Sequence, residues 1–285
     1  MKFNIKSDLI HDISADIIIL AVDDKNQIIQ RPKIPAATLS LLSKIVNGDD
    51  LKQEVGSVTV VHGDITFNRV MLVRTGSAKQ FDAEALIKIV GRVSNTISSL
   101  NVKKVLLPIE QFFNEHICAN AGTEFIVREL INSSYVVNSL KTSKKPTPSI
   151  QTIIQYKGEA LKEVKSGMLH GSAVADGANL TKDLGNLPPN ICTPTYLANI
   201  AKDIAKKHGM KAKIFDKKQI EQLKMGSFLS VAKGSREAPK FITIEHNLGP
   251  KKQKPIVLVG KGITFDAGGI SIKPSPDMDE MKYDM

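Results

Sequence analysis

Four residues near the end of the sequence carry side chains that could do chemistry together. Lys261, Asp266, Lys273 and Asp284 occur within 24 residues and supply two amines and two carboxylates. The apolar run at residues 256–259, just ahead of them, predicts a buried strand. Because ligands of open α/β sheets bind beyond the carboxyl ends of strands, Lys261 and Asp266 stand where a site is expected.

The glycines of this stretch do not form a nucleotide-binding loop. A Walker A loop would need glycine at position 255 and serine or threonine at position 262, where the sequence has Pro255 and Gly262. A dinucleotide-binding fingerprint would need a glycine in place of Phe265. The pair Gly268 and Gly269 instead allows the backbone to turn tightly beside a ligand.

A serine–proline pair at residues 275–276 predicts the start of a helix over residues 277–285. On that helix Asp277, Met281 and Asp284 would share one face. The face mixes acids with a thioether, which suits a metal pocket with an apolar wall. The acidic residues of the first turn can be present simply because negative charge is stabilised at the positive end of the helix dipole. Asp284 lies too late in the helix for that explanation.

The residues ahead of this stretch predict a second α/β domain. Thr193 as N-cap and Pro194 at the first helical position begin a helix that ends at Gly209. Further strands are expected at residues 211–215, 241–245 and 255–259, and a further helix at residues 217–225.

The first half shows the same alternation of strands and helices. Its continuous apolar run at residues 17–22 is typical of a strand covered on both faces. Other strands are expected at residues 58–61, 70–73, 105–109 and 150–156, and helices at residues 82–100, with Asp82 as N-cap, and 118–137. We expect residues 150–156 to return to the first sheet.

A long helical pattern covers residues 159–184, and its glycines would let another element approach closely. We place the domain boundary at its start. The sequence therefore predicts an α/β protein with an N-terminal domain at residues 1–160 and a second domain at residues 161–285. Each domain is expected to contain a mostly parallel sheet flanked by helices.

Composition excludes several classes of protein. The 285 residues are 42% hydrophobic and 24% charged, which is unlike a disordered chain. No run of about 18 apolar residues predicts a membrane span, and the N-terminus does not resemble a secretory signal. Cys118 and Cys192 are far apart in the sequence, so a disulfide framework is not expected. This use of cysteine agrees with a location in the reducing cytosol. The net charge of +10 comes from dispersed lysines without interleaved aromatic residues, which favours a solvated surface over a nucleic-acid footprint.

Two stretches together resemble one known family. The first stretch closely resembles the metal-binding segment of the two-metal cytosolic leucyl aminopeptidases. It comprises residues 259–266 (VGKGITFD), the glycines at 268–269, and residues 271–274 (SIKP), 278–282 (MDEMK) and 284–285 (DM). Residues 183–190 (DLGNLPPN) with 192–194 (CTP) resemble the segment that opens the catalytic domain of that family. The order and spacing of both segments match.

The resemblance implies a role for each candidate residue. Lys261 would bind one divalent metal ion, Asp266 would bridge two, and Asp284 would bind the same ion as Lys261. Lys273 would be the catalytic lysine that polarises the scissile carbonyl, and Met281 would line the pocket for the N-terminal side chain of the substrate. Two Mn²⁺ or Zn²⁺ ions would bind the substrate amine and activate a water molecule.

The resemblance also shows departures. The family's second metal-binding segment, Asn-Thr-Asp-Ala-Glu-Gly-Arg-Leu, does not occur in the sequence, and Ala267 stands where serine is common. The chain therefore resembles the first part of a family member, with a truncated second domain, and is either a fragment or a truncated protein. We expect it to be inactive alone. The alternative is a non-catalytic remnant or a DNA- or protein-binding subunit.

The family resemblance also implies partners and a location. The implied partners are peptide substrates and, when the protein is full length, further copies of the chain in a homo-oligomer of the family's hexameric type. The implied location is the cytoplasm. Nucleic acid remains an alternative partner because the chain is basic and some relatives bind DNA. No membrane association is expected.

Overall fold

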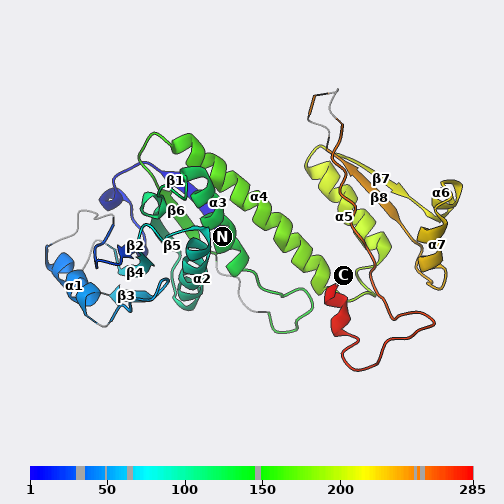
Figure 1. Ribbon diagram of the computed structural model, residues 1–285, viewed down its shortest axis with the longest axis horizontal. Coiled ribbons are helices and arrows are strands. Elements are labelled where there is room, and N and C mark those ends of the chain that lie inside the picture. Colours follow the sequence, from blue (N-terminus) through cyan, green and yellow to red (C-terminus); the bar gives the residue numbers. More distant parts are fainter. Residues whose placement is uncertain are drawn as a thin grey trace. The chain divides into compact units, whose positions relative to one another are not determined.

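The chain forms two compact units, Met1–Leu180 and Thr181–Met285. A computed structural model describes residues 1–29, 36–48, 50–62, 67–144, 149–246, 249–250 and 254–284 (Figure 1). Within these ranges no helix is both long and apolar enough to cross a bilayer.

The first unit is built on one six-stranded sheet in the order β1-β6-β5-β2-β4-β3. Only the β3–β4 pair is antiparallel, so the mostly parallel sheet expected for the first half is confirmed. As predicted, residues 150–156 return to this sheet, where β6 lies between β1 and β5. The strands are β1 (Lys2–Lys6), β2 (Ile17–Asp23), β3 (Val58–His62), β4 (Arg69–Gly76), β5 (Lys104–Pro108) and β6 (Gln151–Gln155).

Helices cover both faces of the sheet. The central strand β2 requires this cover, because residues 17–22 are all apolar and point alternately to the two faces. Ile17 and Ile19 belong to a core that includes α2 and α3, whereas Ile18 and Leu20 belong to a second core that includes α1. Alternate residues of a strand point to opposite faces, so a continuous apolar run needs cover on both sides. The helices are α1 (Ala36–Asn47), α2 (Ala83–Ser99), α3 (Ala119–Ser133) and α4 (Leu161–Asn186), with short 3₁₀ turns η1 (Ile10–Asp12) and η2 (Ile109–Phe112).

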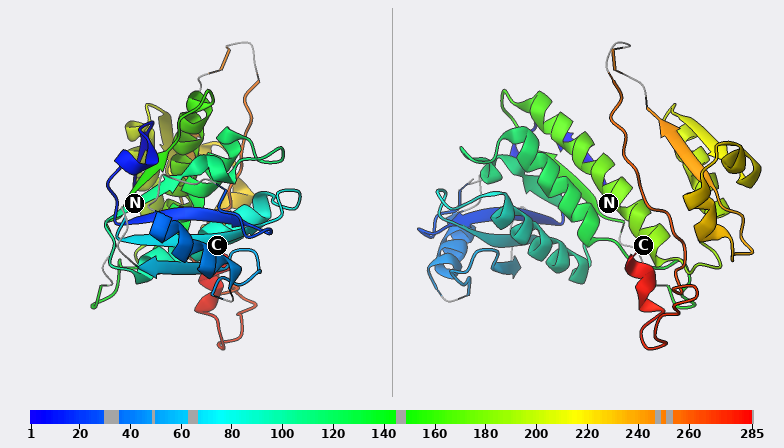
Figure 2. Two further views of the ribbon diagram at one scale, coloured as in Figure 1. Left: turned by 90° about the vertical axis from the view of Figure 1, so that its left-hand side faces the viewer. Right: turned by 45° about the vertical axis from the view of Figure 1, so that its right-hand side comes forward.

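The second unit is coloured from light green to red in Figure 2. It contains α5 (Pro194–Lys207), β7 (Lys211–Phe215), α6 (Lys217–Gln222), α7 (Gly226–Ala232), β8 (Phe241–Glu245) and η3 (Glu280–Asp284). The predicted start of α5 is confirmed, because the Thr193 side chain accepts a hydrogen bond from the backbone N–H of Tyr196 at 3.2 Å. The strands expected at residues 211–215 and 241–245 are also confirmed.

The mostly parallel sheet predicted for the second domain is wrong in the described residues. β7 and β8 form a two-stranded antiparallel sheet. The strand predicted at residues 255–259 is absent, and the side chains of Ile256, Val257, Leu258 and Val259 are 92%, 73%, 92% and 92% exposed. A strand of this composition needs neighbouring strands and apolar cover, which the described part of this unit does not give it.

The α-helix predicted over residues 277–285 is also wrong over residues 277–284, and Met285 lies outside the described residues. Asp277 has a φ of +59°, which an α-helix does not allow. Backbone bonds three residues apart follow, including Glu280 N–H to the Asp277 carbonyl at 3.1 Å, and they lead into the 3₁₀ helix η3. Asp277, Met281 and Asp284 therefore do not share the face of one α-helix.

Two glycines of α4 allow it to pack directly on α3. A Cβ atom added at Gly167 would clash with the backbone carbonyl of Asn120, and one added at Gly171 would lie 2.6 Å from the carbonyl oxygen of Glu124. At Gly177 an added Cβ would meet nothing within 4 Å. The expectation that glycines here permit a close approach is thus confirmed for the first two positions.

We predict that Gly167→Ala and Gly171→Ala each lower the free energy of unfolding by about 1–3 kcal/mol, because α4 must move away from α3. Gly177→Ala is the matched control and should raise stability by up to about 1 kcal/mol through helix propensity. Urea denaturation of the three variants measures this. Equal effects at all three positions would contradict the close packing.

Candidate functional site

Two of the candidate residues, Asp266 and Lys273, lie at the two ends of a turn that closes on itself. The Asp266 carboxylate accepts a hydrogen bond from the backbone N–H of Gly268 at 2.9 Å. The backbone N–H of Lys273 donates to the carbonyl of Ala267 at 2.9 Å. Gly268 has a φ of +90°, and a Cβ atom there would clash with the carbonyl oxygen of Ser271. The turn therefore requires glycine at this position.

The closed turn brings Lys273 to Asp266. The Nζ atom of Lys273 lies 3.3 Å from Oδ2 of Asp266, and both side chains remain partly exposed. The pKa of Asp266 is lowered from its ordinary value, first by the N–H of Gly268, then by the hydrogen bond and charge of Lys273, and last by the charge of Lys261. Three of the four predicted residues are thus electrostatically coupled.

Two of the remaining candidate residues, Met281 and Asp284, lie in η3. Met281 is partly buried there. The backbone of Asp284 ends η3, but its side chain lies outside the described residues. Lys261 is exposed in the irregular stretch ahead of the turn. The prediction that Lys261 and Asp266 follow the carboxyl end of a strand in a second sheet is wrong, because residues 254–259 form no strand.

The described residues do not by themselves fit a two-metal site. They include no cluster of three or more histidine, cysteine, aspartate or glutamate side chains that could hold a metal ion. Both carboxylate oxygens of Asp266 are already engaged, Oδ1 by Gly268 and Oδ2 by Lys273. A hard divalent ion prefers several oxygen ligands, and the described residues of the turn offer one carboxylate.

One feature of the turn was missed in the sequence although its signal is present. An aspartate commonly accepts a hydrogen bond from the backbone N–H two residues later. The sequence Asp266-Ala267-Gly268 has that spacing, with a glycine that can adopt positive φ. The ion pair to Lys273 has no such local signal, because it depends on the path of the backbone between the two residues.

Comparison with known sequences supports the resemblance. Residues 19–144 match the N-terminal domain of the cytosol aminopeptidase family, and residues 179–285 match the catalytic domain of the same family. Members of this family typically bind two metal ions. The whole candidate turn lies in the part that matches the catalytic domain.

Individual relatives agree with these domain matches. A protein of Burkholderia cenocepacia that carries the name "Probable cytosol aminopeptidase" is 40% identical over 258 residues, which are 88% of this chain and 51% of that protein. A protein of the same name from Paraburkholderia phymatum is 40% identical over 259 residues, 89% of this chain and 51% of that protein. The chain thus spans about half the length of the curated relatives it matches.

We predict that Lys273→Ala raises the pKa of Asp266, because the mutation removes both a hydrogen bond and a positive charge. Lys261→Ala should raise it less, since Lys261 acts only through its charge. Because the folded-state pKa is lowered, the pair stabilises the turn above the ordinary pKa of aspartate. That stabilisation is lost as the pH falls through the folded-state pKa. Carboxyl ¹³C NMR titration of the three proteins measures these values, and an unchanged pKa in Lys273→Ala would rule out the ion pair.

Proposed function

Because this chain belongs to the cytosol aminopeptidase family, we propose that it carries the first part of a metal-dependent aminopeptidase that releases N-terminal amino acids, with a leucine-type preference, from peptides. The activity is assigned to the whole protein, since the matched relatives are about twice as long as the shared region. The observation that carries the proposal is the pairing of Asp266 with Lys273 inside the catalytic-domain match.

The chemistry of Lys273 suits peptide hydrolysis. Its ammonium group is held by one carboxylate and is partly exposed, so its other N–H groups can donate to a substrate carbonyl oxygen. A fixed positive charge at that position stabilises the negative charge that develops on the oxygen in the transition state. In this proposal Lys273 is the catalytic residue.

Lys261, Asp266 and Asp284 are the proposed ligands of two divalent ions, Mn²⁺ or Zn²⁺, in the whole protein. Carboxylate oxygens suit both ions, and lysine binds a metal only as the neutral amine. Met281 is proposed to contact the N-terminal side chain of the substrate, which its partly buried position in η3 permits. We further propose that the whole protein acts on peptide substrates, assembles as a homohexamer of the family type and lies in the cytoplasm.

We predict that a polypeptide of residues 1–285 binds Mn²⁺ and Zn²⁺ weakly. Three ligands divided between two ions leave both short of coordination and of negative charge. Isothermal titration calorimetry should detect no submicromolar site. A submicromolar site that Asp266→Ala abolishes would contradict this prediction.

We further predict that residues 1–285 alone do not hydrolyse leucine p-nitroanilide, whereas a chimera that adds the following portion of the Burkholderia cenocepacia relative does so in the presence of Mn²⁺. Lys273→Ala in the chimera should lower the rate by about 10²–10³, the usual effect of removing one donor to an oxyanion. Two results would contradict the proposal. One is turnover by residues 1–285 that disappears in Lys273→Ala. The other is a folded, metal-loaded chimera without activity.

A further inference from the structure

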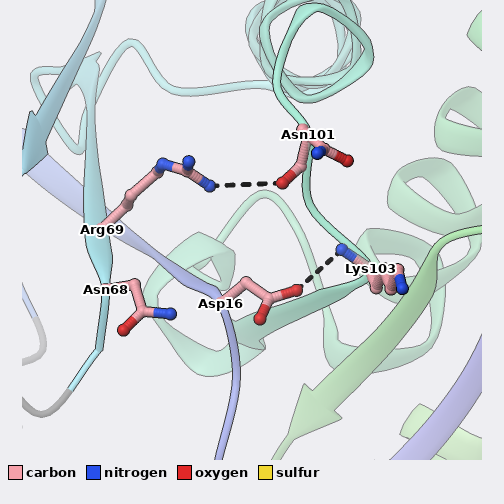
Figure 3. Close-up of a pocket in the computed structure, with 5 residues that line it drawn as sticks. All are labelled: Asp16, Asn68, Arg69, Asn101 and Lys103. Atoms are coloured by element: carbon pink, nitrogen blue, oxygen red, sulfur yellow. Dashed lines mark hydrogen bonds between the residues drawn. The ribbon is translucent and has the colours of Figure 1, made fainter.

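A small polar cavity lies in the first unit at the amino ends of three neighbouring strands. Asp16 immediately precedes β2, Asn68 and Arg69 lie where β4 begins, and Asn101 and Lys103 precede β5. β2 pairs in parallel with both β4 and β5, so these amino ends meet at one edge of the sheet. The cavity has a volume of about 260 Å³ and is lined by these five residues (Figure 3).

The carboxylate of Asp16 is fixed at the wall of this cavity. Its Oδ2 atom accepts hydrogen bonds from the backbone N–H groups of Lys103 at 2.7 Å and Lys104 at 2.9 Å. The backbone N–H of Asp16 donates in turn to the carbonyl of Lys104 at 3.0 Å. Among the described residues Oδ1 of Asp16 has no hydrogen-bond partner, so one oxygen of a positioned carboxylate remains free to accept.

Arg69 presents the opposite charge to the same cavity (Figure 3). Among the described residues, the one hydrogen bond of its Nη1 atom is a long one, 3.5 Å, to the backbone carbonyl of Asn101. Its Nε–H is buried and has no partner among the described residues. A buried donor of this kind loses its hydration without receiving an acceptor in return, which is unfavourable unless a ligand or water supplies one. Arg69 and Asp16 do not form an ion pair with each other within the described ranges.

We propose that this cavity binds the charged head group of a free α-amino acid, with its carboxylate on Arg69 and its ammonium group on Asp16. A simple anion bound to Arg69 would face the free oxygen of Asp16, and a simple cation bound to Asp16 would face the guanidinium group of Arg69. A zwitterion meets both charges at once. Asn68 and Asn101 also line the cavity, and Asn101 faces Arg69 with its backbone carbonyl.

The size of the cavity agrees with this ligand class. Ligand pockets of drug-like molecules begin at about 300 Å³, so a cavity of about 260 Å³ suits a smaller molecule. The site is distinct from the turn at residues 266–273, and its existence does not depend on the proposed peptidase activity. One link rests on the proposed function: free amino acids are the products that an aminopeptidase releases.

The test uses the 285-residue chain in EDTA, where metal-dependent binding and hydrolysis of substrate are both suppressed. L-leucine is titrated by calorimetry beside N-acetyl-leucine, which lacks the ammonium group, and leucinamide, which lacks the carboxylate. We expect L-leucine to bind, and each blocked compound to bind at least about tenfold more weakly, because each loses one charge-assisted hydrogen bond. Absence of L-leucine binding would overturn the proposal. N-acetyl-leucine binding as tightly as L-leucine would do the same, since it would indicate a simple anion site.

Variants then locate the bound amino acid. Arg69→Gln and Asp16→Asn keep hydrogen-bonding side chains and should each weaken L-leucine binding at least about tenfold. Lys88→Ala, an exposed lysine paired with Glu54 on the same unit, is the matched surface control and should bind normally. Lys273→Ala should also bind normally. If Lys273→Ala abolished binding while Arg69→Gln left it intact, the amino acid would occupy the peptidase site and the proposal would fail.

Discussion

The structure of the first unit depends on the burial of β2 on both faces and along both edges. Residues 17 to 22 of this strand are 0–1% exposed. Such a strand leaves no backbone or side-chain atom for water, so it needs hydrogen-bonding strands on each side and apolar helices above and below. β4 and β5 supply the edges, and the cores of α1 and of α2 with α3 supply the two faces. The polar cavity at its amino end follows from the same arrangement, because three aligned strands begin there.

The stretch at residues 256–259 has the same apolar character but none of this cover. Its side chains are almost fully exposed among the described residues, whereas the equivalent positions of β2 are inaccessible. Contiguous exposed apolar side chains of this kind are uncommon on the surface of a folded protein. The contrast explains why the turn at residues 266–273 is locally ordered by its own hydrogen bonds but is not supported by a sheet.

Sequence patterns predict features that depend on neighbouring residues, such as helix caps. They do not predict features that depend on packing against segments far away in the chain. Asp82 caps α2 and Thr193 caps α5 as expected, because a cap involves only neighbouring backbone groups. The glycine contacts of α4 were predictable in kind, since close helix packing requires small side chains. The predicted strand at residues 255–259 and helix at residues 277–285 did not form, because both patterns describe burial that other segments must provide. In the candidate site, the residue types were predictable, and the Asp266–Lys273 ion pair was visible only in the structure.

Among the described residues, the first unit covers its central strand on both faces and both edges, whereas residues 256–259 have no partner strand. Hydrogen–deuterium exchange of residues 1–285 and of the chimera with the relative tests this difference directly. We expect slow exchange throughout β2 in both proteins. We also expect residues 256–259 to exchange rapidly in residues 1–285 and to become protected in the chimera. Protection of residues 256–259 in the 285-residue chain alone would contradict the absence of partner strands for this stretch.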